Sequence, residues 1–154
     1  MNPLPTRPRA VAAADWPLIG TVALGGALGS GARYGLWLLW PTAPGVFPWA
    51  TLWTNVVGCA LMGVLTAVLD ASPQPRAHRL LRPLLATGAL GGFTTVSAYA
   101  LETRALLEGG RTATALAYLA GTLVAALLAV TAAARATRAV LARRSPTDER
   151  GSTA

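Results

Sequence analysis

Residues 84–101 read LLATGALGGFTTVSAYAL, an uncharged stretch just long enough to cross the hydrocarbon core of a membrane. Its middle combines a glycine pair with three hydroxyl residues: Gly91 and Gly92, then Thr94, Thr95 and Ser97. This combination makes a poor continuous helix and predicts a break with freed backbone carbonyls near the membrane midplane. Irregular backbone at that depth is tolerated only inside protein or beside a water-filled cavity, so it indicates a site rather than a kinked packing helix.

The composition of the whole chain supports a membrane protein. Of 154 residues, 53% are hydrophobic and only 12% are charged, whereas a soluble domain carries about 25% charged residues. Helices are the expected form, because backbone groups in lipid must be satisfied internally. Three more apolar segments reach spanning length: residues 18–40, 49–69 and 112–134.

We therefore predict an all-α membrane protein of four transmembrane helices with a broken third helix. The predicted organisation is a mobile cytoplasmic head (residues 1–16), a four-helix channel domain (residues 17–136) and a basic cytoplasmic tail (residues 137–154).

The positive charge of the chain follows the membrane topology. All thirteen basic residues are arginine and most flank the apolar segments, so the net charge of +7 does not indicate nucleic-acid binding. Ten arginines fall on the face that carries both termini and two on the other, which predicts cytoplasmic termini. Four tryptophans lie on either side of the first connector, residues 41–48, and are interpreted as an aromatic belt at the membrane interface: Trp37, Trp40, Trp49 and Trp53.

Two polar side chains interrupt the first two spans. Arg33 lies seven residues before the end of the first span, where it either attracts anions or extends to the interface. Asn55 is a lone amide in the second span, where it either bonds to another helix or offers N–H donors to a passing anion. Chemistry alone favours the helix-to-helix bond for Asn55.

Together these segments resemble the small fluoride channels of the Fluc or CrcB family. The first span carries GALGSGARY at residues 26–34, similar to the family's glycine-rich pattern ending in Arg-Tyr. The second span matches the family at Thr51, Leu52, Asn55 and Gly58. The third matches at Gly88, Gly91, Gly92, Phe93, Thr94, Thr95, Ser97 and Glu102. The resemblance covers all four spans, about residues 20–134.

The resemblance implies a passive channel that exports fluoride from a bacterial cytoplasm and so lowers its toxicity. Such channels are antiparallel dimers in the plasma membrane, with a structural, untransported Na⁺ that backbone carbonyls hold, here those of Gly91 and Thr94. Arg33 would lie at the aqueous vestibule and Glu102 at the end of the anion path. The path itself would involve Asn55, Thr95, Ser97, Tyr99, Val96, Thr51 and Thr122.

This sequence departs from the family pattern at two positions, and a partner subunit could supply its own aromatic residues there. Val96 and Tyr99 stand where the family usually has two phenylalanines. The arginine bias favours one orientation in the membrane, so we expect an antiparallel partner that is a related subunit of opposite topology.

The main alternative is a small four-helix, dual-topology multidrug or cation transporter. Those proteins rely on a carboxylate buried in the first span, and residues 18–40 contain none. An enzyme is disfavoured because the only histidine, His78, lies in a connector and no Ser-His pair or metal-ligand cluster is visible.

Overall fold

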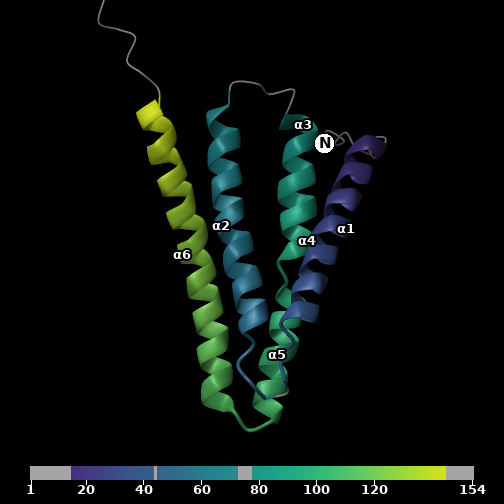
Figure 1. Ribbon diagram of the computed structural model, residues 1–154, viewed down its shortest axis with the longest axis vertical. Coiled ribbons are helices and arrows are strands. Elements are labelled where there is room, and N and C mark those ends of the chain that lie inside the picture. Colours follow the sequence, from purple (N-terminus) through teal and green to yellow (C-terminus); the bar gives the residue numbers. More distant parts are fainter. Residues whose placement is uncertain (1–14, 44, 73–77, 145–154) are drawn as a thin grey trace, which may run out of the picture.

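A computed structural model describes residues 15–43, 45–72 and 78–144. Four long helical stretches alternate in direction (Figure 1). The elements are α1 (Trp16–Leu39), α2 (Trp49–Ala71), α3 (His78–Arg82), η1 (Pro83–Leu90), α4 (Gly91–Phe93), α5 (Val96–Glu108) and α6 (Thr112–Arg144). The start of α1 and the end of α6 lie at one end of the bundle, the terminal end. The links from α1 to α2 and from α5 to α6 lie at the opposite end, the connector end (Figure 1).

The all-helical class predicted from the sequence is confirmed. Three segments are long and apolar enough to cross a membrane: Trp49–Ala71, Arg79–Glu108 and Thr112–Arg143. With 24 residues, α1 is about 36 Å long and so has the length to cross, but its glycines and Arg33 make it less apolar than the other three. The predicted tail begins inside α6, and residues 1–14 and 145–154 of the predicted head and tail lie outside the described residues.

The third span is longer than residues 84–101 in both directions. Helical backbone begins at His78 and α5 continues to Glu108, so only residues 109–111 link it to α6. Gly110 adopts a φ of 71° there, a left-handed conformation that glycine accepts without strain. Residues 83–90 form wider π-helical turns, which begin at Pro83, a residue without a backbone N–H.

The break lies at Thr94 and Thr95 rather than at the glycine pair. Gly91 is helical, with φ −65° and ψ −37°, and α4 continues through Phe93. Thr94 (ψ 158°) and Thr95 (ψ 123°) are extended, a conformation that suits β-branched side chains. The expected break is therefore present, two to three residues after the place that the glycines suggested.

The helices associate as two pairs. α1 lies along η1 and α4, while α2 lies along α6. The pairs diverge toward the terminal end and converge at the connector end, where α5 contacts α6 (Figure 1). A cluster of buried side chains, Leu106, Ala115 and Tyr118, lies at this convergent end, while Ala67 and Leu69 are buried nearer the terminal end of α2.

Glycines allow the backbones of α1 and the third span to touch. A Cβ atom added to Gly88 would lie 2.8 Å from the Val22 carbonyl oxygen. One added to Gly92 would lie 2.5 Å from the Gly26 carbonyl oxygen, again a backbone atom that cannot move aside. Gly88 and Gly92 are therefore required for close packing, whereas a Cβ on Gly91 would make only an ordinary 3.7 Å contact with the Ala86 carbonyl oxygen.

The outer surface of the bundle is apolar. Leu123, Leu127 and Leu128 on α6 are each more than half exposed, at 59%, 57% and 63%. A surface of this kind is suited to lipid or a protein partner rather than to water.

Exposed ion pairs join the helices at the terminal end. Arg79 contacts Asp15 at 2.9 Å, and Asp70 contacts both Arg82 at 3.0 Å and Arg138 at 3.8 Å. Exposed pairs of this kind contribute little to stability. They nevertheless link the start of α1 to α3, α3 to α2, and α2 to α6, where the two helix pairs diverge most.

Candidate functional site

One side chain from α2 satisfies the backbone at the break. The Thr95 N–H donates to Asn55 Oδ1 at 2.8 Å, and Asn55 Nδ2 donates to the Thr95 carbonyl at 3.1 Å. The amide thus replaces both helical partners that Thr95 has lost. This agrees with the helix-to-helix interpretation of Asn55. An amide has two N–H groups, and these two bonds use only one of them, so the donor role remains a prediction.

The side chain of Thr95 starts the next helix. Its Oγ1 accepts a hydrogen bond from the Ala98 N–H at 3.1 Å, which caps the first turn of α5. Ser97 Oγ lies 3.3 Å from the same oxygen. Asn55, Thr95 and Ser97 are therefore brought together at the break, as three residues of one predicted path.

Arg33 points toward the break instead of away from the bundle. Its Nη1 donates to the Thr94 carbonyl at 3.3 Å. Its guanidinium carbon lies 5.6 Å from the centre of the Trp37 ring, within the range of a cation–π contact. A positive charge therefore stands beside the irregular backbone of the third span, which is consistent with anion attraction.

The two carbonyls predicted to hold a cation differ in their surroundings. Among the described residues, no N–H or hydroxyl donates to the Gly91 carbonyl, because Thr95 donates to Asn55 instead. The Thr94 carbonyl accepts the bond from Arg33. Gly91 is also exposed on the surface of the subunit. The Gly91 carbonyl thus has no donor within the described part of the subunit.

A second polar group joins three helices near the connector end. Thr51 of α2 donates to Glu102 Oε1 at 2.8 Å, and the Tyr118 hydroxyl of α6 donates to Glu102 Oε2 at 2.6 Å. The side chains of Thr51 and Tyr118 are fully buried. We call these three residues the carboxylate cluster. Tyr118 escaped the sequence analysis, although it precedes Thr122 by one helical turn on the same face.

Tyr99 extends the carboxylate cluster toward the break. Its ring meets the Tyr118 ring edge to face, with 5.2 Å between centroids. Its hydroxyl donates to the Leu119 carbonyl of α6. The hydroxyl that distinguishes this residue from phenylalanine therefore fixes α5 to α6.

Two predicted path residues lie apart from these groups. Val96 is 79% exposed at the start of α5, so its side chain faces away from the subunit. Thr122 is buried at 3% exposure, and its Oγ1 has no hydrogen-bond partner among the described residues. Their roles in a path remain predictions.

The fold and the site define a class of protein. A small bundle of apolar helices, one of them broken, collects amide, hydroxyl and guanidinium donors at the depth of the break. Such an arrangement is typical of membrane proteins that pass ions, where broken helices are tolerated beside a cavity.

The chain belongs to the CrcB family. The family described as CrcB-like protein, Camphor Resistance (CrcB), matches residues 20–134. A "Fluoride-specific ion channel FluC 2" of Streptomyces avermitilis is 54% identical over 120 residues, which are 77% of this chain and 74% of that protein. A "Fluoride-specific ion channel FluC 1" of Streptomyces coelicolor is 54% identical over 125 residues, 81% of this chain and 80% of that protein. A "Fluoride-specific ion channel FluC" of Paracoccus denitrificans is 51% identical over 111 residues, 72% of this chain and 86% of that protein.

The carboxylate cluster predicts a measurable contribution to stability. Tyr118→Phe removes the hydroxyl that donates to Glu102 and leaves a carboxylate oxygen without its buried donor. We expect the free energy of unfolding in detergent to fall by about 1–3 kcal/mol. Tyr34→Phe is the matched control, because the Tyr34 side chain is 60% exposed. Equal thermal or denaturant stability of the two variants would contradict the prediction.

Proposed function

We propose that this protein is a fluoride channel that lets fluoride leave a bacterial cell down its gradient and so limits its toxicity. The observation that carries the proposal is the 54% identity, over most of the chain, to proteins named as fluoride-specific ion channels. The protein is not an enzyme, since the family is one of channels.

The donors at the break suit the chemistry of this ion. Fluoride is small and strongly hydrated, so a pore that accepts it must replace its water with closely placed donors. Asn55 and the Thr95 and Ser97 hydroxyls lie together at the break, and Arg33 supplies positive charge beside them. These side chains are the ones we assign to the anion path, with Glu102 at its end.

The alternative of a multidrug or cation transporter lacks its principal residue. Such proteins need a carboxylate in the first span, and α1 contains none. Glu102 lies in the third span instead, and both of its oxygens accept hydroxyl hydrogen bonds within the carboxylate cluster.

We extend the proposal to a structural sodium ion at the break. The free, exposed Gly91 carbonyl is an oxygen ligand of the kind that hard cations bind, and it supports this assignment. The Thr94 carbonyl is the second proposed ligand. A cation there would offset the cost of an anion in a medium of low dielectric constant.

We further propose an antiparallel dimer with a related subunit of opposite topology, in the plasma membrane, with both termini of this chain in the cytoplasm. The ten-to-two distribution of arginines supports a single orientation. The exposure of Val96 and Gly91 supports a partner, because a partner would cover them.

The function predicts fluoride-selective flux that depends on Asn55. Liposomes that contain the protein, alone or with its partner, should lose fluoride without ATP and lose chloride far more slowly. Asn55→Ala removes a donor and should lower fluoride flux about tenfold or more per folded protein. Asn55→Asp should be worse, because a carboxylate repels the anion.

A polar residue elsewhere on α2 provides the control for these variants. The Thr66 hydroxyl bonds only to carbonyls of its own helix, so Thr66→Val should conduct like the parent. Equal fluxes of chloride and fluoride in a verified dimer would contradict the channel assignment. Normal conduction by both Asn55 variants would restrict that amide to a packing role.

The sodium assignment predicts an effect of cation replacement. Exchanging Na⁺ for a large organic cation on both sides should reduce fluoride flux and weaken the dimer, measured by its mass in detergent. Gly91→Ala should weaken the dimer too, although its Cβ would make only an ordinary 3.7 Å contact within the subunit. Gly20→Ala, with open space around it, is the control. If neither the replacement of Na⁺ nor Gly91→Ala changes the flux or the stability of the dimer, the sodium assignment is wrong.

The orientation predicted by the arginines is testable in cells. A reporter fused to the C-terminus should read almost entirely on the cytoplasmic side, because short loops rich in arginine stay there. Comparable signals from both sides would instead support a homodimer of copies inserted in both directions.

A further inference from the structure

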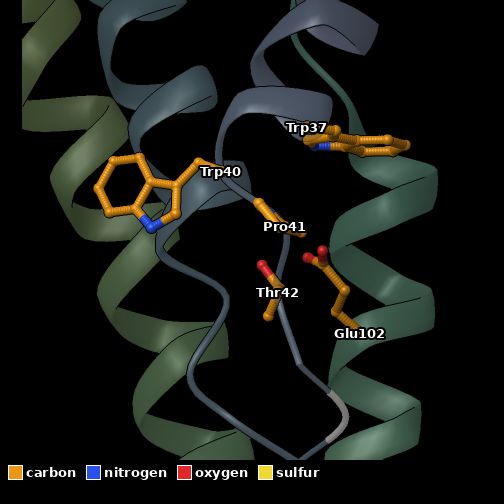
Figure 2. Close-up of a pocket in the computed structure, with 5 residues that line it drawn as sticks. All are labelled: Trp37, Trp40, Pro41, Thr42 and Glu102. Atoms are coloured by element: carbon orange, nitrogen blue, oxygen red, sulfur yellow. The ribbon is translucent and has the colours of Figure 1, made fainter.

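Trp37, in the last turn of α1, lines a cavity beside the carboxylate cluster. The cavity has a volume of about 300 Å³ and is lined by Trp37, Trp40, Pro41, Thr42 and Glu102 (Figure 2). It lies at the connector end, where α1 leaves the bundle and α5 continues toward its turn. The Trp37 ring forms one wall, and the Glu102 carboxylate projects into the space below it (Figure 2).

The indole nitrogen of Trp37 is a donor without an acceptor. Nε1 is buried and finds no hydrogen-bond partner among the described residues. An indole nitrogen can only donate, and a buried donor left unpaired is costly. Placement in an aromatic belt does not explain this, because a belt tryptophan directs its N–H to water or headgroups. The nitrogen has no accessible surface in this arrangement, so an acceptor that enters from the cavity reaches it when the Trp37 ring turns.

The charges around the cavity favour an anion that stays only briefly. The Arg33 guanidinium lies over the Trp37 ring, 5.6 Å from its centre, and makes this wall positive. Glu102 opposes it, but each of its oxygens already accepts a hydroxyl hydrogen bond from Thr51 or Tyr118. Attraction from one wall and repulsion from the other give weak binding, which conduction requires because an ion must also leave.

We propose that Trp37 Nε1 is a docking donor for fluoride at the connector end of the path, and that it sets how well the channel collects the ion at low concentration. This inference rests on the proposed function. Because the nitrogen is buried, an ion that binds it sheds part of its water shell inside the cavity. Arg33, whose guanidinium carbon lies 5.6 Å from the centre of the same ring, reaches onward to the break at Thr94.

The test compares two tryptophans of the same cavity. Trp37→Phe keeps an aromatic ring under Arg33 but removes the N–H. Trp40→Phe makes the same chemical change at a residue that is 51% exposed. Fluoride flux is measured in liposomes from well below to well above saturation, and folding is checked by thermal unfolding in detergent.

We expect Trp37→Phe to raise the fluoride concentration for half-maximal flux about tenfold, the loss that corresponds to one donor to a charged group. Flux at saturation should stay near that of the parent, and Trp40→Phe should change neither value. A second readout is tryptophan emission during titration with sodium fluoride, against sodium isethionate at equal ionic strength. The parent and Trp40→Phe should respond, and Trp37→Phe should not.

Two results would overturn the proposal. One is a concentration dependence for Trp37→Phe that equals the parent's. The other is an equal loss in both variants, which would assign the effect to the aromatic lining rather than to the N–H. A parent protein that passes no fluoride is a different result, since it removes the proposed function itself and not only the role of Trp37.

Discussion

The two hydrogen bonds between Asn55 and Thr95 are the interaction on which the rest of the site depends. A helix cannot be interrupted in a lipid environment unless other groups satisfy its backbone, because no water is present to do so. Asn55 satisfies both the N–H and the carbonyl of Thr95, which offsets the free-energy cost of interrupting the helix. Once Thr95 is held in this way, its side chain can cap α5 and the Gly91 carbonyl is released.

The third span divides its tasks between two kinds of residue. Gly88 and Gly92 allow contact with the backbone of α1, and they remain helical because that contact requires a regular surface. Thr94 and Thr95 provide the extended backbone and the cap. The break and the close packing are thus adjacent in the chain without competing for the same positions.

Sequence reasoning predicts the helices well because spanning segments must be long and continuously apolar. Residues 49–69 and 112–134 both lie within observed helices, and the family resemblance is confirmed. The exact place of the break was less predictable, because glycine weakens a helix in general but is retained here by contact with α1. Pro83 posed a similar difficulty, since a proline suggests a boundary whereas π-helical turns carry the helix through it.

The side-chain network of the site was predictable only in part. Asn55, Thr95 and Ser97 stand in one predicted path and are found together, since the motif places them on the two segments that meet at the break. Tyr118 and the unpaired nitrogen of Trp37 depend on how α6 and α1 pack against α5, and no local pattern fixes that geometry.

The free carbonyl of Gly91 affects how the number of paired subunits depends on the amount of protein that the cell makes. A backbone carbonyl without a donor carries a penalty of several kcal/mol where it faces hydrocarbon, so a solitary subunit that turned Gly91 toward lipid would be a high-energy species. Any arrangement that covers the carbonyl is favoured over the solitary subunit. Where a second subunit provides the cover, the number of sealed pairs rises with the product of the two subunit densities. In the dilute limit, a twofold drop in the expression of both subunits would then remove about three quarters of the pairs, and fluoride tolerance would fall more steeply than expression.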